Sequence, residues 1–204
     1  ITTGTLDLSG ESFDLFLRGT TGSIGALTTA ATKALTLQFT GAVSQTGLID
    51  ADQLRLIDGG FNLSTHNNVL GIISINTLGN ADIFSTSPLT LGNVVDSCGS
   101  SGPNQAGVLN LKAADLTIGT AVSVASAVLS ADAIAVNAAV TSLGDITVRN
   151  CTAGVTIGVG NGAAGALSLT NAEVANLVLS TPGSTLTFGR GDAGKAHLRQ
   201  TFQH

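Results

Sequence analysis

Short triplets of apolar, polar and apolar residues recur along the whole chain. Alternate side chains of an extended strand point to opposite faces, so each triplet places two apolar side chains on one face. Such strands of three to five residues recur every ~8–12 residues, with Gly, Asn, Asp or Ser between them. The pattern predicts an all-β chain with no significant helix, even over Ala121–Ala139, where the apolar residues alternate. The triplets include Leu54–Leu56, Phe61–Leu63, Ile73–Ile75, Leu109–Leu111, Val122–Val124, Ile134–Val136 and Leu177–Leu179.

A four-residue motif of apolar, Thr, apolar and Gly also recurs. Its copies are spaced by 27, 39 and 31 residues. We expect their glycines to form structural turns, because glycine permits a bend that a side chain would crowd. The spacing of 39 residues corresponds either to a coil and a half or to a coil with an inserted loop. The copies are Leu89–Gly92, Leu116–Gly119, Val155–Gly158 and Leu186–Gly189, so the turn glycines are Gly92, Gly119, Gly158 and Gly189.

Short strands at this spacing are typical of a β-sandwich, a β-barrel or a parallel β-helix. The strands are shorter than is usual in sheets, the apolar residues are small and aliphatic, and a local motif recurs at variable spacing. These features favour a parallel β-helix, a solenoid of roughly eight or nine coils. We predict a single segment over residues 1–204, with a loop insertion at 96–106 and a polar tail at 190–204.

Composition narrows the classes of protein. The chain has 204 residues, of which 43 % are hydrophobic, 3 % aromatic and 10 % charged. Disorder and a membrane-spanning helix are excluded, since the chain is apolar but lacks a run of ~20 apolar residues. The net charge of −5 with eight Lys and Arg makes nucleic acid a poor partner. The chain lacks Met and begins at Ile1, so we expect a processed product or fragment, with any secretion signal outside it.

Several stretches resemble the repeats of filamentous-haemagglutinin-type bacterial adhesins. These repeats have the form Q-T-G, I-x-A, L-x-L, G-G-x-x-L, N-x-V and L-T-I-G-x-V. Residues 154–173 also resemble a unit of very large secreted adhesins. The likeness covers about residues 20–190. The stretches that carry it are Val43–Leu56 (VSQTGLIDADQLRL), Gly59–Leu63 (GGFNL), Asn68–Leu70 (NVL) and Pro88–Val94 (PLTLGNV).

The resemblance implies a segment of a giant exoprotein that crosses the outer membrane of Gram-negative bacteria, often by a two-partner system. The parent would then need an outer-membrane secretion partner. Such proteins fold as right-handed β-helical rods on the cell surface. We therefore predict a secreted, non-enzymatic, structural and adhesive rod segment without a cofactor. Its receptor would lie on a host, a neighbouring cell or another surface.

Two alternatives remain open. The ends of a β-helix are open sheet edges, so copies could associate end to end into an extracellular filament. A β-helical polysaccharide lyase or hydrolase is less favoured, because such enzymes need clustered acids or bases, usually with aromatic platforms for sugars. The chain has no Trp or Tyr and few charges.

Three short motifs are candidate sites. Arg190, Gly191 and Asp192 form an RGD tripeptide, which binds integrins when it lies on an exposed turn but also arises by chance in a Gly-rich chain. Asn62 and Asn150 begin glycosylation sequons, although Asn is also common at turns. Gly158–Gly165 superficially resembles a dinucleotide-binding loop, but a strand follows it instead of the required helix.

The remaining polar residues are more readily explained as surface groups. Three acids around Arg55 could form a calcium or lyase site, but solvated corner residues explain them better. The histidines support neither a catalytic triad nor a zinc site. The two cysteines are either separate thiols or one disulfide. These groups are Asp50, Asp52 and Asp58; His66, His197 and His204; and Cys98 and Cys151.

Overall fold

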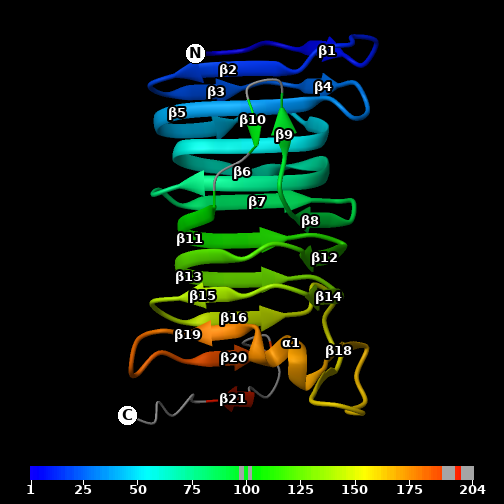
Figure 1. Cartoon of the computed structure of the whole chain (residues 1–204). Coiled ribbons are helices and arrows are strands. Elements are labelled where there is room, and N and C mark those ends of the chain that lie inside the picture. Colours follow the sequence, from blue (N-terminus) through cyan, green and yellow to red (C-terminus); the bar gives the residue numbers. More distant parts are fainter. Residues whose placement is uncertain (97–98, 101–102, 190–195, 199–204) are drawn as a thin grey trace.

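The computed structural model describes residues 1–96, 99–100, 103–189 and 196–198. The regular secondary structure of this part is nearly all β-strand, and parallel strands stack as a solenoid of about seven turns (Figure 1). The predicted β-helical architecture is therefore confirmed. The number of turns is lower than the expected eight or nine, because two coils are lengthened by insertions. Paired residues of neighbouring coils lie 18 residues apart at Leu116 and Ile134, but 40 apart at Ile146 and Leu186.

Three ladders of parallel strands form the wall of the solenoid. Three long strands continue around a corner and so belong to two ladders, and a fourth, the longest, belongs to all three. The first ladder contains β1 (Leu6–Leu8), β4 (Leu27–Thr29), β6 (Ile49–Thr77), β8 (Leu89–Leu91), β12 (Asp115–Ile118) and β14 (Ala133–Val136). The second contains β2 (Leu15–Gly19), β5 (Ala34–Gln45), β6, β11 (Asn104–Lys112), β13 (Val122–Ser130), β15 (Val140–Ser142) and β19 (Leu177–Leu179). The third contains β3 (Gly22–Ile24), β5, β6, β7 (Ala81–Ser85), β11, β13, β16 (Ile146–Arg149) and β20 (Leu186–Phe188).

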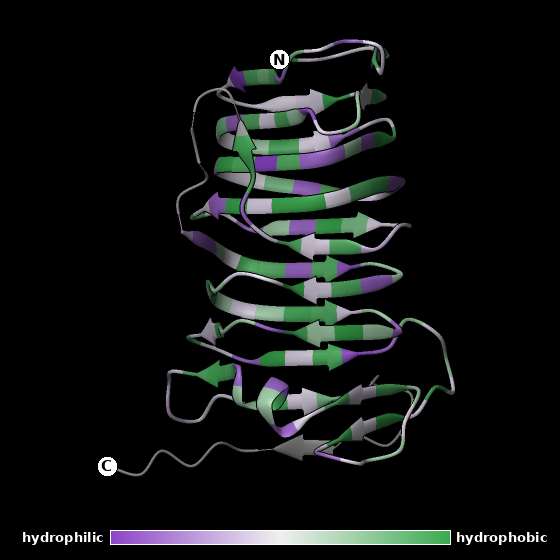
Figure 2. Ribbon diagram, turned by 45° about the vertical axis from the view of Figure 1, so that its right-hand side comes forward, coloured by the Kyte–Doolittle hydropathy of each residue, from purple (hydrophilic) through white to green (hydrophobic). Residues whose placement is uncertain are grey.

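The predicted triplets are confirmed as strands whose apolar residues point inward. Apolar and polar residues alternate along these strands in Figure 2, as a half-buried strand requires. Each fully buried aliphatic side chain stabilises the fold by roughly 1.5–3 kcal/mol relative to its exposure to water. One continuous interior row, in which no residue is more than 2 % exposed, contains Leu63, Ile83, Leu111, Leu129, Val148 and Phe188.

The narrow interior also accommodates aromatic rings where a neighbouring coil has a glycine. Phe39 is fully buried. A Cβ atom at Gly22 would lie 2.7 Å from the Phe39 ring, and one at Gly19 would lie 3.1 Å from it. The two glycines of the preceding coil therefore leave the space that this ring fills, which keeps the packing dense without widening the coil.

A buried amide at one corner links three successive coils. Asn68 is fully buried and exchanges hydrogen bonds with the side-chain amide of Gln45. Its Oδ1 accepts the backbone N–H of Ile49 at 2.9 Å, and its Nδ2 donates to the carbonyls of Leu63 at 2.8 Å and Phe84 at 3.1 Å. The side chain thus provides hydrogen-bond partners for backbone groups that, at this turn, form no hydrogen bonds within the ladders.

The predicted loop insertion contains a short antiparallel hairpin of β9 (Val95–Asp96) and β10 (Gly99–Ser100). β9 runs back along the outside of the solenoid as far as β5 (Figure 1). The predicted boundary at residue 106 is too late, because Asn104–Ala106 already belong to β11. Asn104 is buried, and its Oδ1 accepts the backbone N–H of Ile75 at 2.8 Å.

A second insertion lies between β16 and β19. It does not explain the 39-residue spacing, because one complete coil separates Leu116 from Ile134 and the next copy of the motif, at Val155, already lies within the insertion. It contains a separate pair of parallel strands, β17 (Ile157–Val159) and β18 (Leu167–Leu169), and the one-turn helix α1 (Asn171–Ala175). The sequence pattern did not predict this helix. No helix among the described residues is long and apolar enough to cross a membrane.

Hydrogen bonds hold α1 against the solenoid wall. Thr170 and Glu173 form a capping box, in which each side chain accepts the other's backbone N–H. Burial alone would raise the pKa of Glu173, but hydrogen bonds from Thr170 and from the Val136 N–H lower it overall. Asn176 Nδ2 donates to the carbonyl of Val136 at 2.7 Å. The insertion is therefore attached to the end of β14.

The repeated Thr-containing motif does not mark one side of the solenoid. Its copies at Leu89 and Leu116 pair directly in the first ladder, whereas the copy at Leu186 lies in the third. Gly92 and Gly119 directly follow their strands, and Gly189 follows β20 with a φ of 115°. The turn predicted at Gly158 is wrong, because this residue lies inside β17. The positive φ angles occur nearby, at Gly160 and Gly162.

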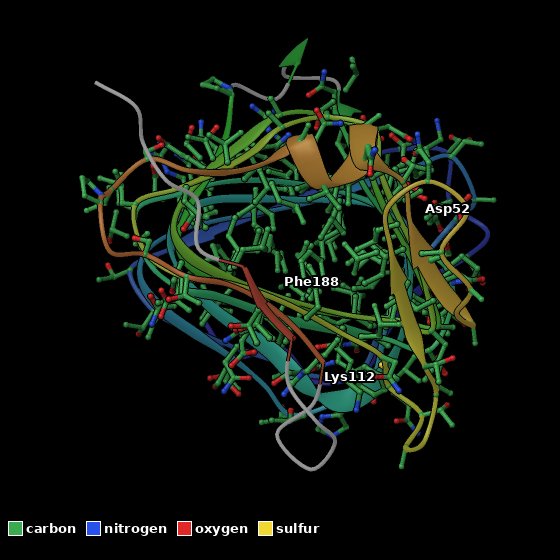
Figure 3. The ribbon with its side chains drawn as sticks, turned by 90° about the horizontal axis from the view of Figure 1, so that it is seen from below. Asp52, Lys112 and Phe188 are labelled. Atoms are coloured by element: carbon green, nitrogen blue, oxygen red, sulfur yellow. The ribbon has the colours of Figure 1, made fainter. Side chains whose placement is uncertain are left out.

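The two ends of the solenoid differ. At the N-terminal end, Leu6, Leu15 and Leu17 are only partly buried. At the other end, β21 (Ala196–Leu198) pairs antiparallel with β20 and so covers the edge of the third ladder. Figure 3 shows Phe188 near the centre of this end, with β21 crossing beside it.

Candidate functional site

An outward-facing groove of about 420 Å³ crosses the third ladder from β6 to β16. Its wall is one row of outward residues in register across four strands, namely Phe84, Lys112, Ser130 and Arg149. Each of them directly follows an inward-facing residue of its own strand, so the alternation of the strand turns it to the outer side of the wall. Neighbouring strands lie ~4.8 Å apart, which places Lys112 and Arg149 about 10 Å apart along the axis.

The two cationic side chains of the groove are held by neighbours in the same row. The ammonium of Lys112 lies 4.7 Å from the centroid of the Phe84 ring, which is a cation–π contact. Arg149 donates from Nε to Oγ of Ser130 at 2.8 Å. Lys112 and Arg149 are exposed, whereas Ser130 between them is 3 % exposed. Both charges therefore line an open groove. In Figure 3, Lys112 lies at the outer rim of the solenoid.

Polar groups complete the groove beside this row. Asp82 and Asn110 pair in the adjacent outward row, two residues before Phe84 and Lys112 in their strands. Both are partly buried and line the groove. The groove thus offers a carboxylate and an amide next to two cations and an aromatic ring. Such a set can bind an anion and hydrogen-bond neighbouring hydroxyl groups.

A larger hollow of about 540 Å³ lies at the corner between the second and third ladders. Three of its four polar side chains already have hydrogen-bond partners. Gln105 donates to Asn76 at 2.9 Å, and Asp58, which has a φ of 72°, accepts from Gln38 at 3.0 Å. The exposed Leu78 forms part of its rim. Because these polar groups are already paired, the groove at Lys112 is the stronger candidate despite its smaller volume.

The three acids around Arg55 do not converge on one point. Asp50 lies in the first ladder opposite Thr28. The carboxylate of Asp52 accepts the backbone N–H of Thr32 at 3.3 Å, while Asp58 binds Gln38 in the neighbouring coil. In the described part of the chain, no three His, Cys, Asp or Glu side chains form a group that could hold a metal ion. The contacts of the three acids are those of residues at the corners and in the wall of the solenoid.

The sequons differ in exposure. Asn62 is exposed on β6, and its Oδ1 accepts from the hydroxyl of Ser64 at 3.0 Å. Asn150 is 4 % exposed, and its Nδ2 donates to the carbonyl of Thr152. The surroundings therefore favour Asn62 over Asn150 as a glycan acceptor, and glycosylation itself stays a prediction.

Other candidates are only partly described. Arg190, Gly191, Asp192, Cys98 and His204 lie outside the described residues, so the RGD motif and the cysteine pairing stay predictions.

The other candidate cysteine and histidines, Cys151, His66 and His197, lie in the described part of the chain and make local contacts. The thiol of Cys151 contacts the carbonyl oxygen of Ala113 at 3.7 Å. His66 Nδ1 lies 3.0 Å from the hydroxyl of Thr65. His197 lies in β21 opposite Thr187.

The groove residues are not among the candidate sites predicted from the sequence, although the strand pattern contains a signal for them. Lys112 and Arg149 each directly follow an apolar-polar-apolar triplet, as does Phe84. If the triplets are aligned, the fourth positions form one outward column. Only the pairing of β7, β11, β13 and β16 shows that these particular triplets are neighbours.

Comparison with known proteins gives no relative: no family profile, curated protein or solved structure matches the chain.

Proposed function

We propose that this chain is a structural and adhesive rod segment of a secreted bacterial surface protein, similar to filamentous-haemagglutinin-type adhesins. In this role it holds binding surfaces away from the cell. A secreted location, an outer-membrane secretion partner for the parent and the absence of enzymatic activity belong to the same proposal. The observation that carries it is the continuous interior of stacked aliphatic residues, which extends from coil to coil.

The stacked interior supports a mechanical role. Each coil contacts chiefly its neighbours, so the stability of a solenoid grows with the number of coils and its length can be extended. Thr, Ser and Asn occupy many of the outward positions, which allows a soluble surface with only 10 % charged residues. The groove at Lys112 and the β9–β10 hairpin are the features through which such a rod could contact a surface.

Attachment and depolymerisation assays test this proposal. Beads that carry the 204-residue chain should adhere under flow to cells or polysaccharide-coated surfaces, whereas beads that carry an unrelated protein of similar charge should not. The same chain, incubated with acidic and neutral polysaccharides, should release no reducing ends and no unsaturated sugars. Catalytic release of fragments would contradict the proposal and favour the lyase or hydrolase alternative. A lack of adhesion to every surface would contradict the adhesive role.

End-to-end association of copies is a second candidate. The partly buried Leu6, Leu15 and Leu17 at the N-terminal end are the observation that favours it. The antiparallel pairing of β21 with β20 covers the edge of the third ladder at the other end, so this candidate involves the N-terminal end.

A further inference from the structure

We propose that the groove between β7 and β16 binds an acidic polysaccharide that lies along the solenoid axis, with successive acidic groups at Lys112 and Arg149. The inference rests on the proposed adhesive function, for which it names the class of ligand. It is carried by the register of the third ladder, which places the two cations in one outward row.

The concentration of positive charge in the groove is unusual for this chain. The whole sequence has only eight Lys and Arg and a net charge of −5. Two of these cations line one groove of about 420 Å³. Among the described residues, neither of them makes an ion pair. A polyanion is therefore attracted at this place by local contacts and not by the overall charge of the protein.

Both cations are oriented before a ligand arrives. The contact with the Phe84 ring holds the Lys112 ammonium, and the bond from Nε to Ser130 uses only one of the five N–H donors of Arg149. The planar end of the guanidinium keeps the donors that bind a carboxylate or sulfate in a bidentate manner. Little side-chain entropy is then lost when an anion binds.

The spacing of the row matches a polymer and not a single anion. The backbones of Lys112 and Arg149 are two rungs apart, about 10 Å. Both side chains lean the same way along the row, Lys112 toward Phe84 and Arg149 toward Ser130, so their charges stay apart and one small anion does not contact both. A sugar unit in an extended polysaccharide advances by about one strand spacing. A polysaccharide that carries an acidic group on every second sugar would therefore place successive acidic groups at the two cations. Asp82 and Asn110 lie beside the row, where they can bind sugar hydroxyl groups.

Nucleic acid fits this groove less well. A nucleic-acid strand carries a charge on every nucleotide and is normally met by a dense set of basic residues. Here two cations share the groove with the Asp82 carboxylate on a chain of net charge −5. The alternating hydroxyl and acid groups of an acidic polysaccharide are complementary to this mixture of cations, a carboxylate and an amide.

Calorimetric titration of the full chain with defined oligosaccharides tests the inference. The probe is an octasaccharide with glucuronate at every second position, and the comparisons are free glucuronate and a neutral dextran fragment of equal length. The octasaccharide should bind, while both comparison ligands should bind at least about tenfold more weakly. The double variant Lys112→Gln/Arg149→Gln should weaken octasaccharide binding about 100-fold, since each charged contact contributes about tenfold.

The matched control is Arg18→Gln/Lys33→Gln, which removes the same charge from an exposed and a partly buried position outside the groove. It should change the affinity less than about twofold. Equal losses in both double variants would overturn the inference, because general electrostatics would then explain binding. No binding of the octasaccharide to the unaltered chain would also overturn it. The absence of octasaccharide binding would not contradict the proposed rod function if beads that carry the protein still adhere to other surfaces.

Discussion

Replacement of Asn68 by alanine is expected to lower the free energy of unfolding by about 3–5 kcal/mol. The side chain is fully buried and binds the Gln45 amide, the Ile49 N–H and the carbonyls of Leu63 and Phe84. Its removal leaves several of these groups buried without a partner. Each such group costs roughly 1–3 kcal/mol, and the cavity adds to this.

Chemical denaturation followed by circular dichroism measures this loss. The matched control is Asn67→Ala, because Asn67 is the adjacent residue and is exposed. It should change the stability by less than about 0.5 kcal/mol. If Asn68→Ala unfolded within about 1 kcal/mol of the unaltered chain, the corner network would not stabilise the coils, and the described geometry at this corner would be contradicted.

Replacement of Gly59 by alanine is expected to be at least as damaging, with a loss of about 3 kcal/mol or more. A Cβ atom at Gly59 would overlap the carbonyl oxygen of Gly41 and lie 2.6 Å from that of Phe39. Both oxygens belong to the backbone of the neighbouring coil, which cannot move without breaking ladder hydrogen bonds. The coils would have to separate locally to admit one methyl group.

The adjacent residue provides a direct control. A Cβ atom at Gly60 would have Asn80 as its nearest neighbour, at 3.6 Å. Gly60→Ala should therefore leave the stability within about 1 kcal/mol of the unaltered chain. Thermal unfolding of both variants measures the difference. If Gly59→Ala does not accumulate as folded protein while Gly60→Ala does, the expectation also holds. Equal stability of the two variants would contradict the close approach of the coils at Gly59.

Much of the fold could be predicted because strand periodicity is a local property. The triplet at Leu54–Leu56 shows by its alternation alone which side chains face inward, and both leucines are fully buried. The stacking of such triplets follows from their need to bury one face. The position of the glycines was less predictable. Gly158 lies inside a strand, and the turn falls at Gly160 and Gly162.

Features that depend on pairing between coils could not be predicted from the sequence. The Thr-containing motif recurs along the chain, but only the pairing shows that its copies at Leu116 and Leu186 lie in different ladders. Helix α1 has only five residues, which is too short for a hydrophobic period to be visible. The groove also depends on pairing between coils, because Lys112 and Arg149 are 37 residues apart in the sequence and become neighbours only through β13.

The central claim is that the coils stack in parallel and in register along one axis. The most direct test is the distance between spin labels at Ser44 and Thr147, which occupy the same outward row five rungs apart. Cys98 and Cys151 are first replaced by serine so that only the two new cysteines are labelled. At ~4.8 Å per rung, the account predicts a backbone separation of about 24 Å with a narrow distribution. A broad distribution centred beyond about 40 Å would contradict the stacked solenoid.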